Sequence, residues 1–270
     1  MERAAPPVAS SRLTSGIAVW ARHADGVSRP DGSPDPHPLD NAVWAALTSH
    51  QAHLCEGDGS ARRFDPEVSA FAAIDVAHDQ AWAALADLAS DEPVALFRDH
   101  IPALPAGWVE VARGEGHQLV LEPHDLTSVG VAPGRPLTGA DVPAMLDLVA
   151  ATTPGPFLAR TIELGRYHGA FESGRLVAMA GERLHLDGFT EISAVCTHPD
   201  ARGRGLAATL TRTIAVGIIG REETPFLHVA RGNDTARRVY ERLGFRERRI
   251  VQFVLTRHGP QPVRLRQSIS

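Results

Sequence analysis

The residues with the clearest chemical meaning are two Arg-Gly pairs, Arg202-Gly203 and Arg204-Gly205, which stand directly before an amphipathic helical segment. The first turn of a helix has backbone N–H groups without intrahelical partners and the positive end of the helix dipole, so it attracts anions. Glycine carries no side chain that would hold a bulky anion away, and arginine adds charge and directional donors. The pattern therefore predicts a cradle for a pyrophosphate group.

A dinucleotide is one ligand that such a cradle could hold, because Gly203, Gly205 and Ala208 satisfy the pattern GxGxxA. That fingerprint normally follows the first parallel strand of a βαβ unit. Here a helix and three predicted strands come before the glycines. The surrounding elements therefore disagree with a dinucleotide-binding fold.

The elements around the cradle follow from hydrophobic periodicity and turn signals. Residues 167–198 are predicted to form three antiparallel strands joined at Ser173-Gly174 and Asp187-Gly188, dipeptides that suit tight hairpin turns. One helix is predicted before them, after the capping-box-like residues 138–141, and another follows the glycines. The remaining predicted elements are a strand at 225–230, a helix at 233–245 and a strand at 248–256. This order is typical of a mixed-sheet α/β (α+β) fold.

The stretch Arg202-Gly-Arg-Gly205-Leu-Ala207 also matches the pattern Q/R-x-x-G-x-G/A of the GCN5-related N-acetyltransferase (GNAT) family. Asn233 at the start of the next helix, Tyr240 seven residues later and the Leu-Gly-Phe ending at 243–245 resemble the family as well. The resemblance is strongest over residues 191–245, and the amino-acid sequence there is most similar to that of the FR47-like branch. It implies the GNAT acyl-CoA N-acyltransferase fold, with the strand that ends at Thr197 as the fourth strand.

The resemblance implies acetyl-CoA as co-substrate and no metal. The pantetheine arm of acetyl-CoA would pair like an added strand with the backbone of the fourth strand, at Val195 and Thr197. Asn233 is expected to border the same site. The pyrophosphate would lie on the loop formed by Arg202, Gly203, Arg204, Gly205, Leu206 and Ala207.

Two residues are predicted to move protons. Glu191 stands where the family often has the carboxylate that deprotonates the incoming amine, and strand alternation would put residues 191, 193, 195 and 197 on one side. The other interpretation of Glu191 is a strand carboxylate paired with a nearby arginine, and both are left open. Tyr240 matches the family's frequent general acid, which protonates the leaving thiolate. Its other interpretation is a core residue with its hydroxyl at the rim.

Other reactive residues are given structural roles. Glu182 on the preceding strand is a reserve base, but an exposed hairpin carboxylate is the commoner explanation. Cys196 is expected to face the opposite side of its strand from its neighbours and to pack as a small apolar residue. His50, His53 and Cys55 match no standard zinc spacing, so no metal site is predicted.

Composition excludes several classes of function. The 27 residues counted as lysine or arginine are all arginine, which excludes a P-loop NTPase and a lysine Schiff-base enzyme. The formal net charge of −5 argues against a nucleic-acid partner. No apolar run approaches the ~20 residues of a membrane span. The N-terminus lacks a signal-peptide pattern, and two isolated cysteines fit a reducing compartment, so a cytoplasmic location is expected.

Local composition and the predicted helices and strands divide the chain into four stretches. Residues 1–38 are predicted to be a flexible N-terminal arm, 39–128 an N-terminal α/β segment, 129–260 the GNAT catalytic domain and 261–270 a C-terminal tail. The segment 39–128 resembles a degenerate acetyltransferase-like half without an Arg/Gly loop. It could shape the acceptor cleft or supply a dimer surface.

These observations predict an N-acetyltransferase that moves an acetyl group from acetyl-CoA to a primary amine by direct transfer in a ternary complex. A non-catalytic module that binds acyl-CoA or a partner is the alternative, and a dinucleotide-dependent oxidoreductase is the third. The acceptor, a small-molecule or peptide amine, would be selected by the loop 152–166 and by the segment after Val251. No membrane partner is expected, and a homodimer is left open.

Overall fold

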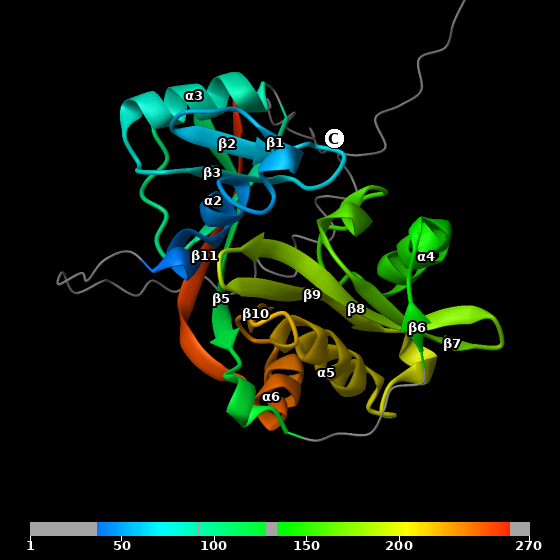
Figure 1. The fold of residues 1–270 in the computed structure, drawn as a ribbon. Helices are drawn as coiled ribbons and strands as arrows, with labels where there is room; N and C mark the ends of the chain where they lie inside the picture. Colours follow the sequence, from blue (N-terminus) through cyan, green and yellow to red (C-terminus); the bar gives the residue numbers. More distant parts are fainter. Residues whose placement is uncertain (1–36, 91, 128–133, 260–270) are drawn as a thin grey trace, which may run out of the picture.

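A sheet of 11 strands runs through the residues that the computed structural model describes, which are 37–90, 92–127 and 134–259. Its strand order is β1-β2-β3-β4-β11-β5-β10-β9-β8-β7-β6, with helices on both faces (Figure 1). The predicted mixed-sheet α/β (α+β) class is confirmed. The predicted N-terminal arm up to residue 36 and the predicted C-terminal tail lie outside the described residues.

The first part of the chain builds one end of the sheet and one central strand. Strands β1, β2 and β3 pair antiparallel, and α3 then carries the chain to β4, which lies parallel to β3. A parallel pair needs such a crossover connection. The elements are η1 (Pro38–Asn41), α2 (Ala42–Leu47), η2 (Ala52–Leu54), β1 (Cys55–Glu56), β2 (Ala61–Phe64), β3 (Phe71–Ile74), α3 (Asp79–Ala89), β4 (Val94–Arg98) and β5 (Trp108–Val120).

The second part of the chain has the predicted order of helices and strands. Strands β7, β8 and β9 form the antiparallel meander, and Gly174 and Gly188 adopt the positive φ that tight hairpin turns need. The elements are η3 (Pro123–Asp125), β6 (Arg135–Pro136), η4 (Gly139–Asp141), α4 (Val142–Thr152), η5 (Thr161–Leu164), β7 (Tyr167–Glu172), β8 (Arg175–Leu186), β9 (Phe189–Thr197), η6 (Pro199–Ala201), α5 (Leu206–Ile219), β10 (Thr224–Ala230), α6 (Asp234–Leu243) and β11 (Arg246–His258).

Strand β5 lies between β10 and β11, antiparallel to both. Its pairing with β11 extends from Val120 opposite Arg246 to Trp108 opposite His258. The predicted division of the chain at residue 128 therefore does not coincide with a break in the sheet. Pairing between segments so far apart in sequence leaves no local signal, which is why periodicity alone could not find it.

Helix α5 covers one face of the second part of the sheet. Its apolar stripe follows the predicted helical spacing, and all of its members are buried against β8, β9 and β10. This packing fixes where α5 begins relative to the end of β9. The stripe consists of Leu206, Leu210, Ile214 and Ile218.

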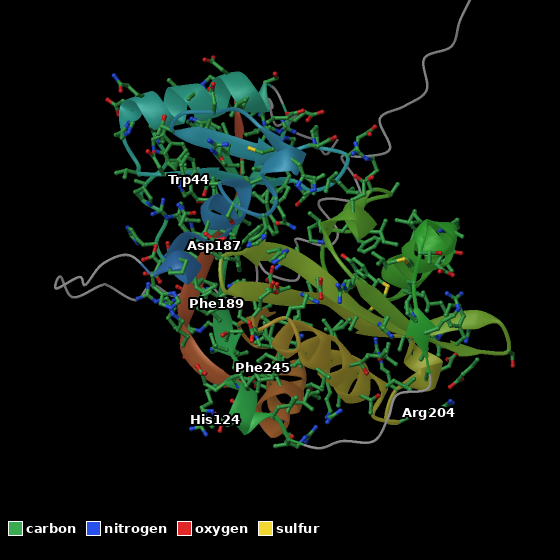
Figure 2. All side chains as sticks on the ribbon, viewed as in Figure 1. Trp44, His124, Asp187, Phe189, Arg204 and Phe245 are labelled. Atoms are coloured by element: carbon green, nitrogen blue, oxygen red, sulfur yellow. The ribbon has the colours of Figure 1, made fainter. Side chains whose placement is uncertain are left out.

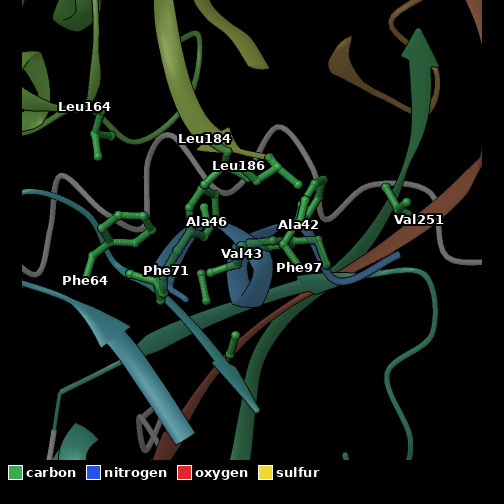
Figure 3. Close-up of a cluster of buried hydrophobic side chains, with 14 of the residues drawn as sticks. Ala42, Val43, Ala46, Phe64, Phe71, Phe97, Leu164, Leu184, Leu186 and Val251 are labelled. Carbon is green, nitrogen blue, oxygen red and sulfur yellow. The ribbon is translucent and has the colours of Figure 1, made fainter. Parts of the chain in front are cut away.

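Helix α2 covers the opposite face and joins the two parts of the chain in one core. Val43 and Ala46 of this helix lie against Leu184 and Leu186 of β8, with Phe71 of β3 in the same cluster (Figure 3). All five side chains are buried. The segment before residue 128 therefore packs directly on the strand that carries part of the candidate site.

Candidate active site

A β-bulge interrupts β9 at Ala194, whose φ of 52° is in the left-handed region. In the register with β8, Cys196 lies opposite Met179 and Ser193 lies opposite Gly181. Strand β9 therefore has one more residue than β8 over this stretch, which is the definition of a bulge. The extra residue reverses the side-chain alternation of β9 beyond Ala194.

The bulge lies where β9 and β10 separate. Their parallel pairing ends at Ile192 opposite Leu227, and a cavity of about 710 Å³ opens beyond these residues. The cavity is lined at one end by the start of α5 and by α6, and at the other end by the loop 153–157 after α4. It therefore connects the two faces of the sheet.

The bulge also decides which side chains face which helix. Val195 packs in the cluster under α5, whereas Cys196 packs with Met145 of α4 and Met179. The prediction that residues 191, 193, 195 and 197 share one side is wrong, because the extra residue shifts the alternation. Cys196 is buried as expected, and burial raises the pKa of its thiol to about 12.

The predicted cradle forms one wall of the cavity. Gly203 and Gly205 both have left-handed backbone, with φ of 79° and 76°, which glycine adopts at little cost. Gly205 is the N-cap residue of α5, so the first-turn amides of that helix have no intrahelical partner. The cradle residues that line the cavity are Arg202, Gly203, Gly205, Leu206 and Ala207.

The side chains of the two cradle arginines have different hydrogen-bond partners, and only one of them lines the cavity. Arg202 lines the cavity, and its Nε donates to the carbonyl of Thr197 at 3.3 Å. Arg204 instead donates to the Glu172 carboxylate at 2.5 Å and to the carbonyl of Asp200 at 3.2 Å. Figure 2 shows Arg204 at the β6–β7 end of the sheet. Only the first of the two predicted guanidinium groups is therefore part of the cavity wall.

Three further predicted residues line the cavity: Val195, Thr197 and Asn233. The hydroxyl of Thr197 is buried and has no hydrogen-bond partner in the described part of the chain. Asn233 is the N-cap of α6, where its Oδ1 accepts a hydrogen bond from the amide of Ala236 at 3.2 Å. Its side-chain oxygen is therefore used to begin the helix.

Tyr240 lines the cavity from the buried face of α6. Its ring packs edge-on against Phe245, with 6.1 Å between centroids. Burial raises the pKa of the phenol well above its usual range, so the hydroxyl keeps its proton. Within the described residues this hydroxyl makes no hydrogen bond, and it is available to a ligand as a donor.

Glu191 is fully buried and is held by Arg183 of the neighbouring strand β8. Arg183 donates from Nε to Oε2 at 2.7 Å and from Nη2 to Oε1 at 2.5 Å, and Nδ1 of His228 lies 2.7 Å from Oε1. Burial alone would raise the pKa of Glu191, but the charge and hydrogen bonds of Arg183, helped by His228, lower it to about 2. A carboxylate this acidic is a weak proton acceptor. The geometry favours the predicted ion pair, and a base role stays a prediction.

His228 of β10 is fixed between Glu191 and Gln118 of β5. The Oε1 atom of Gln118 accepts from Nη1 of Arg248 at 2.8 Å, so its Nε2 is the donor, to the Leu39 carbonyl at 2.9 Å and to Nε2 of His228 at 3.0 Å. Nδ1 of His228 therefore carries the hydrogen that it donates to Glu191. Burial lowers the pKa of His228, so the ring is neutral and both of its nitrogens are occupied.

Comparison with known proteins identifies the family. A family model described as FR47-like protein matches residues 167–254, from the start of β7 into β11. A solved structure from Novosphingobium aromaticivorans, described as a putative acetyltransferase from the GNAT family, is 37% identical, and the match covers 83% of this chain and 100% of that chain with a TM-score of 0.77. This chain belongs to the GNAT acetyltransferase family. It is an acyltransferase, as the sequence predicts.

Two further proteins are similar to this chain. A mycothiol acetyltransferase from Mycobacterium marinum is 36% identical over 101 residues, which are 34% of this chain and 32% of that protein. This chain therefore spans about a third of the length of that relative. A GCN5-related N-acetyltransferase from Kribbella flavida shares the fold at 21% identity and a TM-score of 0.55, covering 80% of this chain and 93% of that one.

The sequence analysis did not single out two residues of this candidate site, Arg183 and His228. Their only signal is a charged or titratable residue within a predicted strand: Arg183 stands between Glu182 and His185 in the stretch 176–186, and His228 is the polar residue of the apolar stretch 225–230. Across the described ranges there is no group of three or more residues placed to hold a metal ion. The helices within those same ranges are too short or too polar to cross a membrane.

Proposed function

We propose that this GNAT enzyme moves an acetyl group from acetyl-CoA to a primary amine by direct attack of the amine on the thioester. The observation that carries the proposal is the cavity between β9 and β10, which joins the glycine cradle to the opposite face of the sheet. A donor bound from the α5 side and an amine bound from the α4 side would meet there. Holding two reactants in this way supplies much of the rate enhancement in such reactions.

The cavity has features that fit acetyl-CoA. The left-handed glycines leave the first-turn amides of α5 open to a pyrophosphate, and Arg202 adds a charge beside them. Beyond Ile192 the edge of β9 is no longer paired with β10, so backbone groups near Val195 are open to an extended pantetheine arm, while the carbonyl of Thr197 already accepts from Arg202. The unpartnered hydroxyl of Thr197 lies on the same stretch.

The leaving thiolate needs a proton, which we assign to Tyr240. Its hydroxyl is protonated, lines the cavity and is free of other hydrogen bonds within the described residues. Acetyl-CoA supplies the activated thioester, and the phenol stabilises the sulfur as the thioester carbon–sulfur bond breaks. The buried thiol of Cys196 has a raised pKa and is therefore a weak nucleophile, which favours direct transfer over an acyl-cysteine route.

Deprotonation of the amine is assigned to solvent in the cavity. No Asp or Glu is among the described residues that line the cavity, and Glu191 lies behind Arg183 with its pKa lowered. His228 offers no free nitrogen lone pair. We infer that the acceptor attacks as the neutral amine, while Glu191 positions Arg183 and His228.

The test is release of free thiol from acetyl-CoA, measured with a broad panel of primary amines including amino acids, small amines, aminoglycosides and peptides. At least one amine should give stoichiometric thiol and acetylated amine, identified by mass spectrometry. The surface variant Arg246→Met is a matched control, because this exposed arginine does not line the cavity. Binding of CoA by calorimetry without turnover of any amine would favour the non-catalytic binding module instead.

We also propose that residues 39–128 are a degenerate GNAT-like half. In support, β3, α3 and β4 repeat the arrangement of β9, α5 and β10, a parallel pair joined by a helix. Strand β11 pairs antiparallel with β4 in the way that β5 pairs with β10. The two halves would then have exchanged their last strands across the centre of the sheet.

A further inference from the structure

Arg183 is held in a fixed orientation by contacts on several sides. Its side chain pairs with Glu191 through Nε and Nη2, and its guanidinium carbon lies 4.9 Å from the ring centroid of Phe71. Gln51 donates to its backbone carbonyl at 2.7 Å. Phe71 and Gln51 come from the first part of the chain, so that part positions the guanidinium. A group held so rigidly loses little conformational entropy when it binds a ligand.

The guanidinium keeps donors that Glu191 does not use. Arginine has five N–H donors in a planar fork. The two on the Nε–Nη2 edge that face Glu191 are occupied, whereas Nη1 and the second Nη2 hydrogen make no hydrogen bond within the described chain. The side chain is 14% exposed and lines the cavity. The open edge of the fork matches a second carboxylate.

The charge of the cavity wall favours some classes of amine acceptor over others. The described lining residues include no Asp or Glu, and the charged ones are Arg183, Arg202 and Arg242. A polycation such as an aminoglycoside or a polyamine would be repelled by these arginines, and no carboxylate among the described lining residues would compensate. An amine that also carries a negatively charged group could form an ion pair with one of the arginines.

The acceptor end of the cavity favours a small molecule. Phe157, the last residue of the loop 153–157, and Tyr167 form part of its wall, packed edge to face at 5.8 Å between ring centroids. The whole cavity is about 710 Å³, and in the proposed function it also holds the pantetheine arm. Little space is left for a large acceptor.

We propose that Arg183 binds a carboxylate of the acceptor, so that the substrates are small amines that also carry a carboxylate, with amino acids as the simplest class. This inference rests on the proposed acetyl transfer. Arg183 is then a binding residue for the acceptor, and Glu191 is the residue that positions it.

The experiment compares matched acceptors that differ only at the carboxylate: L-phenylalanine, L-phenylalaninamide and phenethylamine, with alanine, alaninamide and ethylamine as a smaller set. In the wild-type enzyme, kcat/KM for the amino acid should exceed that for its amide by about 10- to 100-fold, mostly through KM, because a charge-assisted pair is lost. The double variant R183M/E191Q, which leaves no unpaired charge, should bring this ratio close to one.

Three further variants keep the test interpretable. Glu191→Gln alone should keep the amino-acid preference, since the arginine is still present. Arg183→Lys should keep only part of it, because lysine lacks the planar fork. Arg246→Met, the same chemical change at an exposed site outside the cavity lining, should keep all of it. CoA binding by calorimetry shows that each variant is folded.

The possible failures are distinguishable. If the amides or decarboxylated amines are acetylated as well as the amino acids, the inference is overturned while the proposed function stands. The same holds if R183M/E191Q binds CoA and keeps the wild-type preference. If an enzyme that binds CoA acetylates no amine of the broad panel, the proposed function fails and the inference fails with it.

Discussion

Arg183 and Glu191 hold each other through two hydrogen bonds, 2.7 Å from Nε to Oε2 and 2.5 Å from Nη2 to Oε1, beside the cavity. Removing one member of a buried pair leaves the other charge unpaired, which costs about 3–5 kcal/mol. Glu191→Ala is therefore expected to lower the free energy of unfolding by roughly that amount, measured by urea denaturation. R183M/E191Q should lose less, and equal losses in the two variants would contradict this account.

The same pair predicts how acid affects stability. The pKa of Glu191 is lowered from 4.5 to about 2 in the folded protein, so below pH 4.5 the unfolded chain binds the proton more readily. The contribution of Glu191 is complete above pH 4.5 and is lost as the pH falls towards 2. Urea unfolding between about pH 6 and about pH 3 should show a smaller loss for Glu191→Gln than for wild type. A larger loss in the variant would reverse the sign and refute the assignment.

The pH dependence of the rate tests whether the protein supplies a base. If the acceptor loses its proton to solvent, the acid limb of kcat/KM follows the ammonium pKa of the acceptor. Two amines whose pKa values differ by about two units should then give limbs displaced by about two units. An acid limb at one fixed pH for both amines would restore Glu191, or another group of the protein, as the base.

Tyr240→Phe should slow the chemical step without preventing binding. The variant keeps the ring that packs on Phe245 and removes only the hydroxyl that lines the cavity. Loss of a general acid lowers kcat by about 100-fold or more. Single-turnover kinetics with acetyl-CoA give this rate, and calorimetry should find the CoA affinity little changed. A wild-type rate would leave Tyr240 with only its packing role.

Gly205→Ala should weaken the binding of CoA. The left-handed φ of 76° costs an alanine roughly 1–2 kcal/mol, so the substitution would shift the loop away from the conformation that presents the first-turn amides of α5. An increase of about tenfold in the Kd for CoA is expected by calorimetry. Gly217→Ala within α5 is the matched control, since this helical glycine is not among those with positive φ and does not line the cavity. Equal effects of the two substitutions would argue against the cradle.

The features that could be predicted from sequence are those with a local cause. The hairpins at Gly174 and Gly188, the stripe of α5 and the glycine cradle each depend on residues close together in the chain. The family resemblance also lies in a continuous stretch, and it pointed to the correct fold. Glu191 was singled out for the same reason, because it stands at a fixed distance before the cradle.

The features that could not be predicted depend on distant partners. The bulge at Ala194 has no composition signal, and it reversed the expected alternation beyond that residue. The roles of Arg183 and His228 appear only when β8, β9 and β10 are placed side by side. His228 in turn meets Gln118 because β5 is inserted next to β10, a pairing between segments about a hundred residues apart.

The position of β11 has a consequence for biosynthesis. Strands β4 and β5 leave the ribosome long before β11. In the folded sheet, however, β11 lies between β4 and β5 and pairs with both. A nascent chain halted before residue 246 would expose unsatisfied strand edges at the middle of the molecule, where association with other chains is easiest. The centre of the sheet can close only after β11 has been synthesised, so we expect chaperones that shield open strand edges to bind the nascent chain before that point.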